Sequence, residues 1–221
     1  MTGLPDVTTL VAYAIVLLTA FSVHEFAHAW TANYFGDDTP RMNGRLTLNP
    51  LAHLDPIGSL MLIFAGFGWA KPVPVSLYAL ERRSPAAPMW VALAGPLSNF
   101  LMALLAAIPF RIGLIKLQYF AGSYHVSTRL PDFLAQILFT FLTTNLLLMV
   151  FNLLPIFPLD GEKVATYAFP PYMACVLDTI RPYGPMVLLL LILMGSFAGV
   201  NLLGTILNPP LMALLRVLLG V

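Results

Sequence analysis

Four apolar stretches, each about long enough to cross a lipid bilayer, constrain the fold of this chain more than any other feature. They cover residues 7–34, 88–110, 133–154 and 184–203. A helix needs about 20 mostly apolar residues to cross the ~30 Å hydrocarbon core. Hydrophobic residues make up 59% of the chain, and charged residues only 10%, against about 25% in soluble domains. We therefore predict a single integral-membrane domain, residues 1–221, built as an all-α bundle of about 4–6 transmembrane helices.

Three further segments are apolar but do not have the pattern of a single transmembrane helix. Residues 205–219 contain "NPP" and predict either a broken last span or a helix lying at the membrane interface. Residues 57–68 are too short and too rich in glycine to span, and indicate a re-entrant segment. The alternation in "KPVPVSL", residues 71–77, predicts an extended edge strand, because proline lacks the donor that a central strand needs. A membrane-associated β-strand or hairpin is therefore expected between the first two spans.

The basic residues predict how the chain is oriented. Five Lys and Arg residues lie in 36–86, three in 111–131 and two in 155–183. With alternating spans the first and third of these loops share a side, and the positive-inside rule places that side in the cytosol. We predict a multi-pass protein of the cell membrane with its N-terminus outside.

The motif "HEFAH", residues 24–28, places ionisable side chains inside the first apolar stretch. Residues four apart share a helix face, so His24 and His28 can both bind one zinc ion, with Glu25 placed as general base for a water molecule. Alternatively, the histidines line a polar helix contact and Glu25 pairs with an arginine. Burying such groups in a membrane costs roughly 2.5 kcal/mol or more, which favours a functional role.

A hydrolytic zinc site needs a third protein ligand, and the spacings of the soluble zinc proteases do not supply one. Thr31 and Tyr34 stand where a glycine and a histidine ligand would be, and the next glutamate, Glu81, lies in a loop. The remaining candidates are His53, Asp55, His125, Asp160, Glu162 and Asp178.

Asp160 stands out among these candidates by its context. It follows "FNLLPIFPL", in which Pro155 and Pro158 interrupt an apolar span. Broken backbone at membrane depth is tolerated where it is buried in protein or lines a cavity, so this turn can aim a carboxylate into the bundle. The alternative is that Asp160 is the N-cap of a helix that starts at Gly161, with Glu162 favouring the positive end of that helix.

The two motifs together, "HEFAH" and "NLLPIFPLDG" at 152–161, resemble the site-2 protease family of intramembrane zinc metalloproteases, peptidase family M50. "GWAKPVPV" at 68–75 and "AGPLSN" at 94–99 resemble its compact prokaryotic branch, which lacks PDZ and CBS domains. The resemblance implies that His24, His28 and Asp160 bind one Zn²⁺ and that Glu25 activates the water. It also implies that Asn152 contacts the scissile region of the substrate. Glu162 is a departure, because many relatives have a second glycine there.

The function that this resemblance implies is hydrolysis of peptide bonds in or near transmembrane segments of membrane-tethered substrates. Candidate substrates are an anti-sigma factor, a membrane-tethered transcription regulator or a signal-peptide remnant, and the partners are these proteins and the lipid bilayer. The net charge of +1 gives no indication of nucleic acid. The rival functions are a metal transporter with a transit site at the same residues, and an inactive relative that only binds transmembrane helices.

A substrate helix must unwind before its peptide bonds can be attacked, and each freed backbone group needs a partner in hydrocarbon. We expect Val73 and Val75 to lie on the edge strand beside the zinc and to pair with the unwound substrate. Alternatively, this segment only plugs the bundle. His53 is a candidate for a residue that contacts the metal ligands, for a gate or for a helix cap. About 17 apolar residues precede His24, a rise of roughly 25 Å, which places the zinc inside the membrane toward the cytosolic side.

Overall fold

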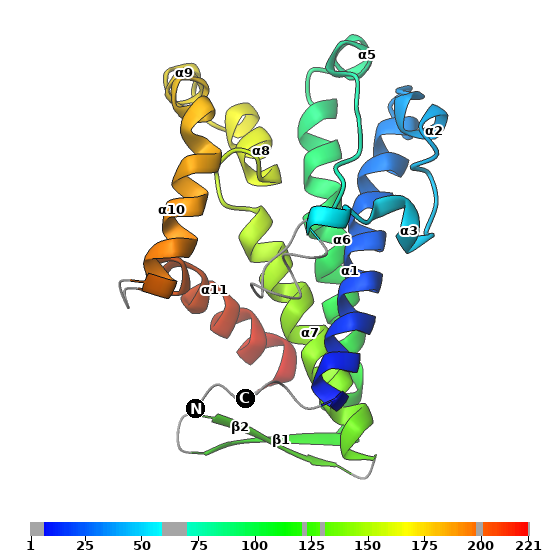
Figure 1. Cartoon of the computed structure of the whole chain (residues 1–221), viewed down its shortest axis with the longest axis vertical. Coiled ribbons are helices and arrows are strands. Elements are labelled where there is room, and N and C mark those ends of the chain that lie inside the picture. The colour runs from blue at the N-terminus through cyan, green and yellow to red at the C-terminus, as the bar shows by residue number, and fades with distance from the viewer. Residues whose placement is uncertain (1–6, 59–69, 121–122, 129–130, 198–200, 221) are drawn as a thin grey trace.

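The protein is an elongated helical bundle with short helices gathered at one end and a β-hairpin at the other (Figure 1). The structure is a computed structural model that describes residues 7–58, 70–120, 123–128, 131–197 and 201–220. Helices α1, α6 and α7 run along the long axis, and α10 and α11 lie to one side of them.

The elements follow one another along the chain as helices interrupted once by a two-stranded sheet. In the described residues they are α1 Val7–Tyr34, α2 Thr39–Met42, α3 Pro50–His53, α5 Leu77–Arg83, α6 Ala87–Arg111, β1 Ile115–Phe120, β2 Ser123–Thr128, α7 Asp132–Asn152, α8 Asp160–Ala168, α9 Pro171–Ile180, the 3₁₀ turn η1 Arg181–Tyr183, α10 Gly184–Phe197 and α11 Leu202–Leu219.

Four helical runs in the described residues are long and apolar enough to cross a membrane: Ala87–Arg111, Phe133–Asn152, Pro171–Met194 and Leu202–Leu219. Helix α1 has 28 residues, which gives a length of about 42 Å at 1.5 Å per residue. The prediction of an all-α polytopic membrane protein is confirmed.

The core lies where α6, α7 and α11 meet. Ala103 and Ala107 of α6 pack against Leu142 and Leu146 of α7, and Leu215 of α11 joins the same cluster. Lipid is as apolar as leucine, so helices in a membrane gain little from hiding apolar surface. Small residues instead let two backbones approach closely, which is how the alanines of α6 hold this contact together.

The C-terminal spans differ from their predicted limits. The stretch 184–203 is not one span, because α10 begins at Gly184 but ends at Phe197, and the apolar run that is long enough to cross includes α9 and η1. Residues 205–219 belong to α11, which keeps Pro209 and Pro210 inside one helix of 18 residues. Of the two alternatives for this segment, a spanning helix fits its length and composition.

The strand predicted at 71–77 is wrong. Residues 71–76 have no regular secondary structure and α5 begins at Leu77. The N–H of Lys71 donates to the carbonyl of His53 at 2.7 Å, and side chains make the other contacts. The Arg45 guanidinium donates to the carbonyls of Lys71 and Pro72, at 3.2 Å each, and Ser76 N–H donates to Asp37 at 2.7 Å.

Antiparallel pairing does occur at two other places in the described residues. A single bridge between Leu54 and Ala70 lies between the first two spans. The β1–β2 hairpin, in which Ile115 pairs with Thr128, lies between α6 and α7. The re-entrant segment predicted at 57–68 falls almost wholly outside the described residues.

Candidate metal centre

Two histidines of α1 and one aspartate of α8 bring three ligand atoms together inside the bundle. Nε2 of His24 lies 3.0 Å from Nε2 of His28. Oδ2 of Asp160 lies 3.2 Å from the first and 3.3 Å from the second of these nitrogens. The two histidines are buried, and Asp160 is only slightly exposed. These three residues form the one group of potential metal ligands found among the described side chains.

The opposite ring nitrogens fix the tautomers of both histidines. Nδ1 of His24 lies 2.6 Å from Oδ1 of Asn99, and Nδ1 of His28 lies 2.7 Å from the carbonyl of Val91. Both partners are acceptors, so each Nδ1 carries the proton and donates it. The neutral imidazoles therefore turn the lone pairs of their Nε2 atoms toward each other and toward Asp160.

Three electron-rich atoms that converge in this way require a positive charge between them. Oδ2 of Asp160 is buried and has no hydrogen-bond partner in the described part of the chain. Ligands about 2.0–2.1 Å from a tetrahedral zinc ion lie about 3.3 Å apart, close to the three separations here. The donor set of two imidazoles and one carboxylate also suits zinc. The residues present therefore fit the metal.

Gly95 explains why α6 can approach the site so closely. A β-carbon at this position would overlap with the ring nitrogens of both His24 and His28. The helix therefore needs glycine here, which assigns a physical role to the glycine of "AGPLSN". Asn99 lies one turn further along α6 and reaches His24 from the same helix face.

A buried chain of amides continues from the metal ligand into α7. Nδ2 of Asn99 donates to Oδ1 of Asn145 at 2.9 Å, and Nδ2 of Asn145 donates to the carbonyl of Phe141 at 2.8 Å. Both asparagines are fully buried. Sequence reasoning missed Asn145, although a polar amide inside an apolar span was the available signal.

The turn between α7 and α8 sets the position of Asp160. Helix α7 ends at Asn152, and the chain is irregular until α8 begins. Gly161 lies so close to the carbonyls of Leu153 and Leu154 that a β-carbon would overlap with them. The N-cap of α8 is Leu159, and no side chain caps the helix. The alternative reading of Asp160 as an N-cap is therefore not what the structure has.

Glu25 is buried beside the two histidines on α1. The four ion pairs among the described residues involve His24, His28, Arg181 and their carboxylate partners, and none of them includes Glu25. The alternative in which Glu25 pairs with an arginine therefore finds no support in this part of the chain. A carboxylate next to the ligand set and outside any ion pair can still accept a proton.

Among the side chains that the structure describes, the other candidate third ligands do not join the cluster. Nε2 of His53 lies 2.8 Å from the carbonyl of Thr47, and Asp55 accepts from the N–H of Gly58. Glu162 and Asp178 both face Arg181. His125 lies on β2, not in a loop. His53 is buried, but the groups that contact the metal-binding histidines directly are Asn99 and Val91.

The predicted substrate-binding residues lie on two different segments, Asn152 on α7 and Val73 and Val75 in the irregular segment 71–76. Asn152 is the last residue of α7, and its Nδ2 donates to the carbonyl of Leu148. Val75 packs against a small cluster that includes Ala32 of α1 and Val91 of α6. The carbonyl of Val91 accepts a hydrogen bond from Nδ1 of His28. Val91 therefore lies between segment 71–76 and this histidine.

Comparison with known proteins supports the metal and the chemistry. The chain is 37% identical over 196 residues to "Putative zinc metalloprotease YwhC" of Bacillus subtilis, covering 86% of this chain and 84% of that protein. It is 32% identical over 179 residues to "Putative zinc metalloprotease Rip2" of Mycolicibacterium smegmatis, and covers 64% of its length. The Mycobacterium tuberculosis protein of the same name is 32% identical over 187 residues, with 66% of its length covered.

No protein-family model and no solved structure matches the chain. The identity to YwhC nevertheless extends over most of both chains, and the relatives agree in their named activity. Together with the His–His–Asp cluster among apolar helices, this similarity shows that the chain belongs to the site-2 protease family of zinc metalloproteases, peptidase family M50.

Proposed function

We propose that this zinc metalloprotease cleaves peptide bonds within or near transmembrane segments of membrane-tethered proteins. The observation that carries the proposal is the placement of the ligand cluster. His24 and His28 lie in the second half of α1, and Asp160 reaches them from a turn that follows the apolar helix α7. A hydrolytic site built from membrane helices favours substrates that are themselves in the membrane.

The residues of the site divide the work between holding the metal and moving a proton. His24, His28 and Asp160 hold zinc, which when bound makes a water molecule more acidic and polarises the scissile carbonyl. Glu25 is the general base that takes the proton of this water and later delivers it to the leaving amine. Asn99 and Val91 keep both imidazoles in the tautomer that leaves Nε2 free for the metal.

The irregular segment 71–76 supports a role in substrate binding. Among the described residues, the N–H groups of Val73 and Val75 have no backbone hydrogen-bond partner, whereas Arg45 and Asp37 hold the neighbouring groups. An unwound substrate segment pairs with these backbone groups through hydrogen bonds. Asn152, at the end of α7, contacts the scissile region.

The distribution of charge supports a site toward the cytosol. The short helices α2, α5, α8 and α9 lie at one end of the molecule and the β1–β2 hairpin at the other (Figure 1). The segments that contain these short helices, described as residues 36–58, 70–86 and 155–183, carry seven Lys and Arg residues. The positive-inside rule assigns this end to the cytosol. Anti-sigma factors, tethered transcription regulators and signal-peptide remnants are the substrate classes that suit this location.

The decisive test is Glu25→Gln. The amide cannot accept a proton, so cleavage of a model transmembrane substrate should fall by about 10²–10⁴-fold while one zinc per chain is retained. Glu81→Gln, which changes an exposed glutamate of α5, is the matched control and should cleave like the wild type. A zinc-loaded Glu25→Gln protein with wild-type turnover would refute the assignment, and zinc transport into vesicles by a protein that cleaves nothing would favour the transporter instead.

The role of segment 71–76 in substrate binding is tested by Val75→Pro. This substitution removes one backbone N–H with little change in bulk. It should depress cleavage of a helical substrate much more than cleavage of a short extended peptide, because only the first depends on partners for freed backbone groups. Equal losses on both substrates would mean that the segment only plugs the bundle.

A further inference from the structure

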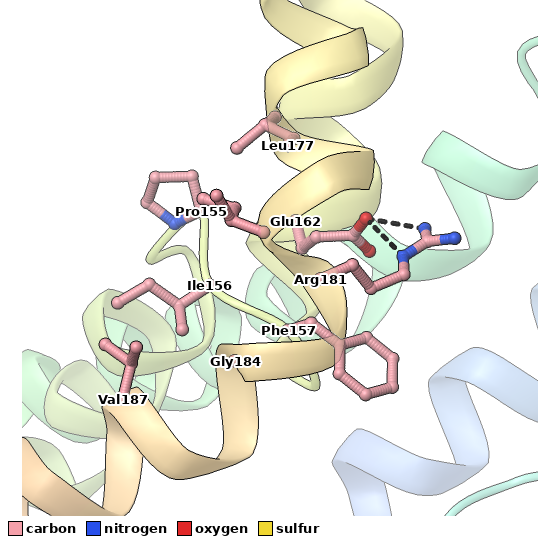
Figure 2. Close-up of a pocket in the computed structure, with 9 residues that line it drawn as sticks. Pro155, Ile156, Phe157, Glu162, Leu177, Arg181, Gly184 and Val187 are labelled. Atoms are coloured by element: carbon pink, nitrogen blue, oxygen red, sulfur yellow. Dashed lines mark hydrogen bonds and ion pairs between the residues drawn. The ribbon is translucent and has the colours of Figure 1, made fainter.

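Helix α8 carries two carboxylates that face in different directions. Asp160 is its first residue and Glu162 follows two residues later. Residues two apart on a helix lie about 200° apart around its axis. Asp160 contacts the histidines of α1, whereas Glu162 points to Arg181 at the junction of α9 and α10 (Figure 2). The helix is therefore held from two opposite sides.

The contact on the second side is an ion pair between a buried carboxylate, Glu162, and a guanidinium, Arg181, whose side chain is 42% exposed. Nε and Nη2 of Arg181 donate to Oε1 of Glu162 at 2.9 and 2.5 Å. The Glu162 side chain is 2% exposed, so its negative charge depends on this partner. Asp178 lies 3.7 Å from Nη1 of Arg181 but is itself 57% exposed. Removing the guanidinium would leave the buried charge of Glu162 uncompensated, which is costly, whereas the exposed contact with Asp178 contributes little.

Arg181 also contacts the turn that leads to Asp160. Its guanidinium carbon lies 5.8 Å from the centre of the Phe157 ring, and Gly184 lies so close to the Phe157 carbonyl that a β-carbon would overlap with it. Figure 2 shows Arg181 beside both Phe157 and Glu162, next to a cavity of about 60 Å³. Phe157 precedes Asp160 by three residues and Glu162 follows it by two, so Arg181 holds the chain on both sides of the ligand.

We propose that Arg181 is a positioning residue for the metal. By holding Glu162 and Phe157, it fixes the rotation of α8 and thereby the place of Oδ2 of Asp160 relative to the two Nε2 atoms. The inference rests on the assignment of Asp160 as a ligand. The proposal also gives a role to Glu162, which stands where many relatives have a second glycine after "DG". A glycine at this position could not form the ion pair with Arg181.

The experiment measures how fast the detergent-solubilised, zinc-loaded protein loses zinc to EDTA, together with its melting temperature. Arg181→Gln and Glu162→Gln should each weaken zinc retention by about 10–100-fold, the range for groups that orient metal ligands. Arg181→Lys keeps the charge but not the two-nitrogen contact, so it should keep a melting temperature near wild type and still lose zinc faster. Asp178→Asn is the matched control and should retain zinc like the wild type.

Zinc loss at the wild-type rate in Arg181→Lys would overturn the proposal, whatever Arg181→Gln does. If Arg181→Gln does not give folded protein, the comparison of Arg181→Lys with Asp178→Asn decides. Asp160→Ala serves a separate purpose: if it keeps full zinc occupancy, the ligand assignment fails and not the role of Arg181. None of these measurements depends on cleavage, so they stand apart from the proposed proteolysis.

Discussion

Helix α6 and the run Pro171–Met194 are both apolar enough to cross a membrane but are packed very differently. In the most apolar part of α6, 44% of the residues are buried inside the protein, whereas in the run Pro171–Met194 only 6% are. Because apolar surface alone drives no association in lipid, the packing of α6 must come from other features. These are its small residues, Gly95 and the alanines, and the amide of Asn99, which bonds across to α1 and α7.

The run Pro171–Met194 lacks most of these features and presents many of its apolar side chains outward. Val176, Met186 and Leu190 are at least half exposed, which in a membrane means contact with lipid. Among the described residues, Arg181 contacts Phe157 of the turn before Asp160 and Glu162 of α8, and Gly184 packs against the Phe157 carbonyl. The comparison teaches that hydrophobicity places a helix in the membrane, while small and polar residues decide what it packs against.

The largest effect should come from Gly95→Ala. One methyl group at this position overlaps with the metal-binding nitrogens of His24 and His28, so the ligands themselves must move. We expect zinc affinity to fall by more than the roughly 100-fold upper end for changes outside the ligand set. Leu101→Ala, at an exposed position of the same helix, should bind zinc normally, and metal analysis of both proteins compares them. Full zinc occupancy in Gly95→Ala would show that α6 does not lie close enough to the two histidines for this methyl group to displace them.

A smaller effect is expected for Asn99→Ala. The variant removes the acceptor that fixes the tautomer of His24 and also leaves Asn145 without its donor. Zinc affinity should fall by about 10–100-fold, measured by competition with a chelator. Asn43→Ala changes an exposed asparagine at the end of α2 and should leave the affinity unchanged. An unchanged affinity in Asn99→Ala would mean that the amide chain supports only the packing of α6 on α7.

The smallest effects test the packing contrast directly with one substitution in each region. Leu142→Ala in α7 removes a fully buried side chain, and Leu190→Ala in α10 removes one that is 57% exposed. The first should lower the free energy of unfolding by about 1–3 kcal/mol, less than in a soluble core because lipid accepts leucine as readily as the protein interior does. The second should stay within about 0.5 kcal/mol. Both values are measured by unfolding in detergent. Equal losses of unfolding free energy in the two variants would contradict the difference in packing between the two regions.

Most of the candidate site could be read from local sequence. The spacing of His24 and His28 is a property of any helix, because residues four apart share a face. The prolines ahead of Asp160 predict a break in an apolar span, and the structure has an irregular turn there. The apolar stretches predict the helices α1, α6 and α7 to within about two residues, the usual uncertainty of helix ends.

The strand predicted at 71–77 shows where local patterns fail. Alternation of valine and proline is compatible with a strand, but a strand also needs a partner with free backbone groups. In the folded chain the guanidinium of Arg45 and the carboxylate of Asp37 take that place. Both residues lie more than 25 positions earlier in the chain, and nothing in the sequence of the segment predicts these contacts.

The sequence by itself determined that the chain is a membrane protein and which residues are candidates for the metal site, because apolar length and helical spacing act over one or a few turns. The tertiary structure decided how those groups are held. Asn99 and Val91 select the histidine tautomers, Gly95 lets α6 approach, and Arg181 holds α8 from the far side. Each of these contacts joins residues of different helices, and such contacts depend on how the helices pack and not on the spacing within any one of them.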